Sequence, residues 1–231
     1  MNSIVILVCS DFEWDYVINH FKNKKLERSP YGNWFIHHHF LKKNNRKVIW
    51  FKSGWGKIGS AGATQYVIDT FAPDLIINIG SCGGFSGYIE KNEVVLVNKT
   101  IVYDMIDLIG TSGKSIEFYK TSIDYEWLKD KTILKLPKAV IVTADQDLDP
   151  ERLSELHDKY NAVVGDWESG AIAFVAAKNG NKLLILRGVS DVVGIEGNKA
   201  YREDERIFLE GVNNVMQKLM DIIKNLIKTI H

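Results

Sequence analysis

The sequence predicts an α/β fold in which helices cover both faces of a central mixed, mostly parallel sheet, giving three layers (α/β/α). Short apolar runs rich in β-branched residues recur along the chain, which is typical of strands buried in parallel sheets. Helical patterns separate several of these runs, and glycine-rich or acidic residues follow them directly. A length of 231 residues suits one large α/β domain, so we expect a single domain over residues 1–231.

The first quarter of the chain predicts a strand, a helix and a hairpin. Residues 3–9 form an almost wholly apolar run, and Ser10 or Asp11 can cap a helix that runs to about residue 22. Residues 34–41 and 47–53 predict two strands joined across a polar turn. The histidines at 37–39 have no nearby cysteine or acidic partner for a four-ligand zinc site, so we expect no metal there.

Three glycines after the hairpin imitate a dinucleotide-binding motif. Gly54, Gly56 and Gly59 satisfy G-x-G-x-x-G and precede a helix expected at 60–71. The motif requires an acid at the end of the following strand to hold a ribose hydroxyl, whereas Asp74 stands at the start of one. We therefore interpret the glycines as a sign of close packing between helix and strand.

The central stretch of the sequence is a strand followed by glycines. Residues 75–79 predict a fully buried strand, and the chain is expected to leave it through a loop at 80–84. Glycine lets a backbone approach a ligand closely, and Ser81 and the free amides can donate hydrogen bonds to it. Ligands bind outside the carboxyl ends of strands in open α/β sheets, so this loop is a candidate ligand site. The alternative is an ordinary glycine-rich turn.

The remaining sequence continues the pattern. Strands are expected at 94–98, 100–103, 139–143, 162–165 and 182–187, and helices at 150–159, 170–178 and 203–230. Residues 114–135 are polar and mixed and predict no clear element. The last helix repeats apolar residues that predict a side facing the core, namely Phe208, Val212, Val215, Leu219, Ile222 and Leu226.

Composition favours a small-molecule partner. Lys plus Arg equal Asp plus Glu at 29 each, so no overall charge would attract nucleic acid or an anionic membrane. Cys9 and Cys82 lie in or beside apolar strands, which predicts buried free thiols in a reducing, cytoplasmic compartment. The N-terminus lacks a basic leader and predicts a core strand instead of a signal peptide, and no segment approaches transmembrane length.

Polar side chains follow four of the predicted strands directly. They are Glu13, Ser81, Glu168 and the pair Ser190 and Asp191. One acid alone is most simply a helix cap or an ion-pair partner. Strand exits of a doubly wound sheet converge on one edge, so three acids at separate exits predict a shared site.

The order of several segments resembles a known family. KSGWGKIGSAGAT, APDLIINIGSCGG, YDMID, DWESGAIAFVA and RGVSDV follow one another as in the nucleoside phosphorylases and nucleosidases, specifically the 5′-methylthioadenosine/S-adenosylhomocysteine nucleosidases. The resemblance runs nearly end to end. It implies a nucleoside phosphorylase-like fold, hydrolysis of the N-glycosidic bond of a purine nucleoside, no cofactor, and a homodimer whose partner helps to close the 5′ end of the site.

The resemblance also implies roles for the acids. Asp191 resembles the general acid that protonates purine N7, and Ser190 beside it orients the carboxyl. Glu168 resembles the carboxylate that holds the ribose hydroxyls. Glu13 resembles the residue that positions or deprotonates the attacking water, and Ser81 the loop serine near that water.

The remaining implied positions bind the substrate. Gly83 belongs to the glycine-rich loop, Leu148 offers its backbone to the base, and Tyr201 falls where the family has an aromatic lid over the purine. Trp167 stands where nucleosidases usually have methionine under the ribose, and a larger ring would reshape the sugar and 5′ pocket. Asp147 stands where an aromatic normally stacks on adenine.

Known chemistry agrees with these roles. Breaking the C1′–N9 bond builds positive charge on the sugar while electrons enter a purine that leaves poorly as an anion. Protonating N7 makes the purine neutral and requires an aspartic acid that stays protonated near neutral pH, which the apolar neighbours Val189, Val192 and Val193 favour. A carboxylate facing the ribose stabilises the cation, and another serves water as a base.

Hydrolysis is favoured over phosphorolysis by the segment at 9–15. It offers no cation and up to three negative charges. Unit charges at about 4 Å interact by ~4 kcal/mol at an effective dielectric near 20, so this segment should repel phosphate. Asn78, where phosphorylases of this family tend to carry arginine, agrees with this. A phosphorylase and a non-catalytic nucleoside-binding protein on the same fold remain the alternatives.

Overall fold

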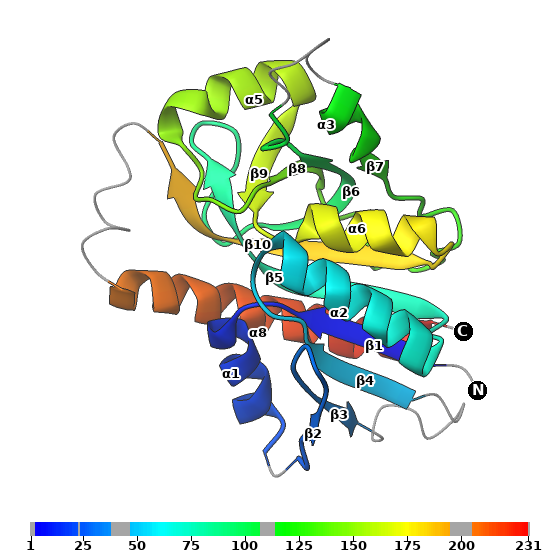
Figure 1. The fold of residues 1–231 in the computed structure, drawn as a ribbon. Helices are drawn as coiled ribbons and strands as arrows, with labels where there is room; N and C mark the ends of the chain where they lie inside the picture. The colour runs from blue at the N-terminus through cyan, green and yellow to red at the C-terminus, as the bar shows by residue number, and fades with distance from the viewer. Residues whose placement is uncertain (1–2, 23, 38–46, 107–113, 195–204, 231) are drawn as a thin grey trace.

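A mixed ten-stranded sheet forms the centre of the computed structural model, which describes residues 3–22, 24–37, 47–106, 114–194 and 205–230 (Figure 1). The strands are β1 (Ser3–Val8), β2 (Glu27–Arg28), β3 (Asn33–His37), β4 (Lys47–Lys52), β5 (Leu75–Phe85), β6 (Val94–Val102), β7 (Thr121–Ser122), β8 (Lys138–Thr143), β9 (Ala162–Asp166) and β10 (Leu183–Val193). The helices are α1 (Asp11–His20), α2 (Gly56–Phe71), α3 (Lys114–Phe118), α4 (Lys131–Leu134), the 3₁₀ turn η2 (Pro150–Arg152), α5 (Leu153–Tyr160), α6 (Ser169–Lys178) and α8 (Glu205–Thr229).

The strand order shows that part of the sheet closes on itself. The order is β10-β6-β8-β9-β5-β1-β4-β3-β2, with β7 beside β6, and β10 also pairs with β5. β5, β10, β6, β8 and β9 therefore form a ring, and β1 and β4 extend from it through parallel pairs. The α/β class and the mixed sheet predicted from the sequence are found. Antiparallel pairings, including β5 with β9 and β6 with β10, stand beside the parallel ones.

Helices cover both faces of the sheet because the strands carry apolar residues on both. Along β1, Ile4 and Ile6 belong to the core beneath α1 and α8, whereas Val5 and Leu7 belong to the core beneath α2 and α6. This alternation follows from the two-residue period of a strand. Figure 1 shows α2 and α6 on one face of the sheet and the long helix α8 on the other.

Two strands continue beyond their predicted ends. β5 extends through the expected loop at 80–84 to Phe85, and β10 extends through the expected exit at 188–191 to Val193. The two strands pair in parallel from Ile76 with Leu183 to Phe85 with Val193, so the ladder holds the glycine-rich segment extended. The prediction of a loop at 80–84 was wrong because local glycine content could not reveal this long-range pairing.

Most other predicted elements are confirmed within one to four residues. The antiparallel pairing of β3 with β4 confirms the hairpin, whose turn at 42–46 lies outside the described residues. β6 is one strand with an irregular register between Val97 and Lys99, where the sequence predicted two. The segment at 114–135 contributes α3, β7 and α4. His37 is buried against Phe21, and the other two histidines of the run lie outside the described residues.

The closing helix α8 packs through the stripe that the sequence predicted. Val212, Val215, Leu219 and Leu226 are buried, and Phe208 and Ile222 are partly buried against the same core. The helix lies across β10 and β5, so it supports the two strands that continue past the expected sheet edge. Gly188 of β10 gives α8 room, because a Cβ atom there would lie 2.4 Å from Cβ of Val215.

We expect Gly188→Ala to lower the free energy of unfolding by about 1–3 kcal/mol, because the added methyl group overpacks a rigid contact between strand and helix. Gly59→Ala is the matched control: its Cβ would meet no atom closer than 3.5 Å, and the helical position favours alanine by about 0.5–1 kcal/mol. Urea unfolding of both variants measures the difference. Equal stability of Gly188→Ala and the native protein would contradict the packing described here.

Candidate active site

A cavity of about 380 Å³ lies at the carboxyl ends of β1, β5, β9 and β10. Eight residues that the sequence analysis selected line it: Glu13, Ser81, Gly83, Leu148, Trp167, Glu168, Ser190 and Asp191. Tyr201, the ninth, lies outside the described residues. The three acids from separate strand exits therefore face one cavity large enough for a small molecule.

Glu13 is held by hydrogen bonds on both of its carboxylate oxygens. Its Oε1 accepts from the backbone amide of Ser81 at 2.6 Å and from the Ser81 hydroxyl at 2.8 Å. Its Oε2 accepts from the amide of Ser10 at 3.3 Å, while the Ser10 side chain accepts from the Glu13 amide. This reciprocal capping box starts α1 and fixes a carboxylate that is only 4 % exposed. Gly80 allows the approach, since a Cβ there would lie 2.8 Å from Oε1.

A β-bulge directs Asp191 into the cavity. The pairing of β10 with β5 goes from Val189 with Cys82 to Asp191 with Gly83, so Ser190 has no opposite residue. The Ser190 hydroxyl lies 2.7 Å from Asp191 Oδ1 and 3.3 Å from the carbonyl oxygen of Cys82. The serine thus connects the carboxyl to the backbone of β5.

The surroundings of Asp191 favour its protonated form. Burial raises the pKa of this carboxyl above its ordinary value, and the negative charge of Asp147 raises it further. The hydrogen bond from Ser190 and the charge of Lys91 act in the opposite direction. Asp147 is exposed and lines the cavity, so the unusual acid noted in the sequence influences a site carboxyl directly.

Glu168 reaches across the cavity to the start of α2. Its Oε1 accepts from the amide of Gly56 at 3.0 Å, and its side chain does not cap its own helix. Burial, together with the charge of Asp166, raises the pKa of the Glu168 carboxyl to about 8, although the charge of Arg187 opposes this. Gly56 has φ +73° and its Cβ would lie 2.8 Å from Asp145 Oδ1. A glycine at position 56 thus lets the backbone amide reach Glu168 while Asp145 lies close by. The sequence analysis had interpreted this glycine as a sign of close packing between helix and strand.

Beneath the acids lies a buried ion pair that the sequence analysis missed. Arg187, 1 % exposed, donates from Nε to Asp166 Oδ2 at 2.9 Å, and its Nη2 forms an ion pair with the same oxygen at 2.8 Å. Nη2 also donates to Asn78 Oδ1 at 2.8 Å. Thr143 donates to the other Asp166 oxygen, so the carboxylate is well satisfied. An arginine inside an otherwise apolar strand was the available signal, because a buried charge requires a partner.

The same arginine explains the position of Asn78. The Asn78 amide donates to the carbonyl oxygen of Leu7 at 3.1 Å, and its oxygen receives Arg187. Asn78 is fully buried and is not part of the cavity lining. The guanidinium of Arg187 does not line the cavity either, and its Nε and Nη2 donate to protein acceptors.

Cys82 also lines the cavity, and a cysteine at such a position can in principle act as a nucleophile. It is 4 % exposed, and burial raises the pKa of its thiol well above the ordinary value. The thiol therefore stays protonated and is a poor nucleophile near neutral pH. Cys9 is also a buried free thiol, as the sequence predicted.

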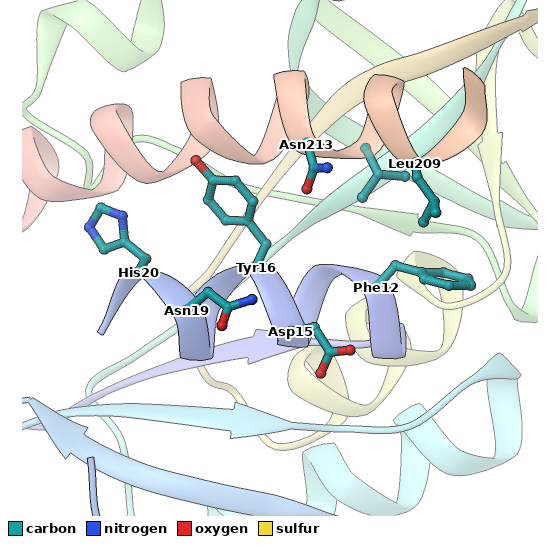
Figure 2. Close-up of a pocket in the computed structure, with 8 residues that line it drawn as sticks. Phe12, Asp15, Tyr16, Asn19, His20, Leu209 and Asn213 are labelled. Atoms are coloured by element: carbon teal, nitrogen blue, oxygen red, sulfur yellow. The ribbon is translucent and has the colours of Figure 1, made fainter. Parts of the chain in front are cut away.

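A second, larger cavity of about 490 Å³ lies between α1 and α8 (Figure 2). Figure 2 shows Tyr16 and His20 extending from α1 toward α8, with Leu209 and Asn213 on the facing helix. None of the candidate site residues selected from the sequence lines this cavity. Phe12 borders both cavities, so α1 separates this groove from the acidic site.

The described residues show neither a metal-binding cluster nor a membrane-spanning helix. Among the described residues, no group of three or more His, Cys, Asp and Glu side chains is arranged to hold a metal ion. In the same part of the chain, no helix has the length and apolar character needed to span a bilayer.

Comparison with known proteins agrees with this architecture. A 5′-methylthioadenosine/S-adenosylhomocysteine nucleosidase of Marinomonas sp. (strain MWYL1) is 27% identical over 76% of this chain and 81% of its own length. The corresponding protein of Buchnera aphidicola subsp. Acyrthosiphon pisum (strain Tuc7) is 29% identical over 80% of this chain and 84% of its own. The solved structure of the Campylobacter jejuni nucleosidase superposes with a TM-score of 0.78 at 18% identity and covers 99% of each chain.

The strongest assignment comes from a family profile. The profile described as the phosphorylase superfamily matches residues 3–228, which is nearly the whole chain. The nucleoside phosphorylase-like fold expected from the sequence is thereby confirmed, and the chain belongs to the phosphorylase superfamily.

Proposed function

We propose that this protein hydrolyses the N-glycosidic bond of a purine nucleoside, 5′-methylthioadenosine, S-adenosylhomocysteine or a related 5′-substituted adenosine, and releases the base. The observation that carries the proposal is that Glu13, Glu168 and Asp191 line one cavity of about 380 Å³. The relatives named as nucleosidases support the same reaction. No cofactor enters the proposed chemistry.

Asp191 is the proposed general acid. It gives its proton to purine N7 as the C1′–N9 bond breaks and the bonding electrons enter the ring, so the base leaves neutral. Ser190 orients the carboxyl through the 2.7 Å hydrogen bond. Leu148 and Gly83 form the surface beside the base, since a Cβ on Gly83 would lie 3.0 Å from Leu148 and 3.8 Å from Asp191 Oδ2. Tyr201 stays a proposed lid residue.

Glu13 and Glu168 act on the sugar side. Water adds its oxygen to C1′ and passes a proton to Glu13, whose position is fixed by Ser81. In its ionised form, which the hydrogen bond from the Gly56 amide and the charge of Arg187 favour, Glu168 accepts hydrogen bonds from the ribose hydroxyls and stabilises the positive charge that develops on the ring. Trp167 lies beside it under the sugar. Arg187 and Asp166 hold this floor rigid without touching the substrate.

The site chemistry favours water over phosphate. The cavity-lining residues among those described include Glu13, Glu168 and Asp191 and no lysine or arginine. Arg187 donates from Nε and Nη2 to Asp166, Ser169 and Asn78, and Lys52 is paired with Asp11. A phosphate dianion would therefore meet carboxylates without a free cation to balance its charge.

We further propose how the protein assembles and where it acts. We take the chain as one three-layer domain with a mostly parallel sheet that acts as a homodimer in the cytoplasm. Support for the dimer is that Ile58 and Ile106, which follow the ion-paired residues Lys57 and Asp104 closely in sequence, are 87% and 71% exposed. Exposed apolar side chains that gather into one surface patch mark protein contacts.

Base release in the absence of phosphate is the direct test of the proposed function. Incubation with 5′-methylthioadenosine, S-adenosylhomocysteine, adenosine and inosine in phosphate-free buffer should give free purine, measured by chromatography, and 5′-substituted adenosines should react fastest. Added phosphate should leave the rate unchanged and yield no sugar phosphate. Release that depends on phosphate would identify a phosphorylase, and tight binding without release a nucleoside-binding protein.

Replacement of the proposed acid separates chemistry from binding. Asp191→Asn keeps the shape and the contact to Ser190 but has no proton of suitable acidity for N7. We expect kcat to fall by at least about 10²-fold with nucleoside Kd changed by less than about threefold. Stopped-time assays and calorimetric titration measure the two quantities, and a fully active Asp191→Asn protein would remove this residue from the mechanism.

The pH profile should report the raised pKa of Asp191. The acid is active when protonated, so kcat/KM should fall as pH rises through its pKa in the folded protein. Asp147→Asn removes a negative charge that raises this pKa, which should move the alkaline fall to lower pH. Asp74→Asn is the control, because Asp74 directly precedes β5, at the end of that strand away from the cavity. An unshifted profile in Asp147→Asn would contradict the coupling.

A further inference from the structure

Four aromatic side chains from separate parts of the chain form a continuous wall of the acidic cavity. Phe208 of α8 lies edge-on to Phe12 of α1, with ring centroids 5.7 Å apart and planes at 83°. Phe12 lies 6.4 Å from Trp55, and Trp55 meets Trp167 at 6.2 Å and 83°. All four line the cavity, and we call them the aromatic wall.

The aromatic wall stands at the sugar end of the cavity. Phe12 and Trp167 directly precede Glu13 and Glu168, and Trp55 precedes the glycine whose amide binds Glu168. The opposite end is formed by Gly83, Leu148 and Asp191, which are neighbours of one another. In a nucleoside the base is attached to C1′ and the 5′ carbon to C4′, so the two groups extend from opposite ends of the sugar ring. A substrate with its base at Asp191 therefore directs its 5′ substituent toward the aromatic wall.

The wall offers apolar surface without cationic help. Trp55 lines the cavity and is 49% exposed, so its ring is accessible to a bound group. The described residues of the lining include five carboxyl side chains and no lysine, arginine or histidine. Among the described lining residues, a carboxylate on the 5′ substituent, as in an amino acid group, would find no cation to pair with. The surroundings therefore select a neutral group.

We propose that the aromatic wall is a subsite for a flat, neutral, aromatic 5′ substituent, and that Trp55 and Trp167 determine this specificity. The inference rests on the proposed nucleoside hydrolysis and names the substrate class within it. The perpendicular indole rings suit such a group, because a planar ring can stack against one indole and meet the edge of the other. A small methylthio group would leave most of this surface in contact with water.

The test compares adenosines that differ only at the 5′ position. The arms are 5′-methylthio, 5′-cyclohexylthio and 5′-phenylthio derivatives, S-adenosylhomocysteine and S-adenosylmethionine, with adenine release as the readout. We expect kcat/KM for the phenylthio compound to exceed that for methylthio by about tenfold and that for cyclohexylthio by about threefold. In Trp55→Leu the tenfold ratio should fall to about threefold or less.

Tyr88→Leu is the matched control for that variant. Tyr88 is 48% exposed, like Trp55, but stacks on His157 and is not part of the cavity lining. Its removal should leave the tenfold ratio in place. Thermal unfolding of Trp55→Leu shows that the variant is folded.

The outcomes separate the inference from the proposed function. Adenine release with equal kcat/KM across the thioethers, or with preference for either charged substrate, would overturn the aromatic subsite and leave hydrolysis intact. If no compound releases adenine, hydrolysis fails. Calorimetric titration of the phenylthio and methylthio compounds into the native protein then decides the subsite alone: a tenfold lower Kd for phenylthio supports it, and equal values refute it.

Discussion

The parallel pairing of β5 with β10 is the constraint on which the site depends. Ten residue pairs join the two strands, from Leu183 with Ile76 to Val193 with Phe85. The ladder carries Ser81 and Gly83 on one strand, and Ser190 and Asp191 on the other, past the part of the sheet that β1 reaches. Residues more than a hundred positions apart in sequence become neighbours because two backbones share hydrogen bonds. The bulge at Ser190 then turns the acid toward the cavity.

The second constraint is electrostatic. Several carboxylates in a small volume repel one another, and the buried guanidinium of Arg187 is the charge that offsets this repulsion from below. Its Nε and Nη2 donate to Asp166, Ser169 and Asn78, and the guanidinium is not part of the cavity lining. The acids have different surroundings. Glu13 accepts several hydrogen bonds, whereas Asp191 is buried near another acid, Asp147, which raises its pKa.

The sequence predicted the class of fold and most residues of the site because both depend on local patterns. Apolar runs located the strands, and the acids after them were visible as such. The continuation of β5 and β10 was not predictable, since glycine-rich segments have low strand propensity and the pairing partner lies far along the chain. The Arg187 and Asp166 pair and the aromatic wall were also missed. Each joins residues whose contact follows only from the folded sheet.

The capping box at the start of α1 makes one carboxylate part of both the fold and the chemistry. Glu13 satisfies the amide of Ser10 at the helix terminus while its other oxygen is held by Ser81. If the first turn of α1 frays, the helix end opens and Glu13, the proposed general base, loses its fixed position at the same time. Heat or denaturant should therefore abolish activity before the sheet unfolds. Substitutions that stabilise this single turn would lengthen the time for which the protein stays active.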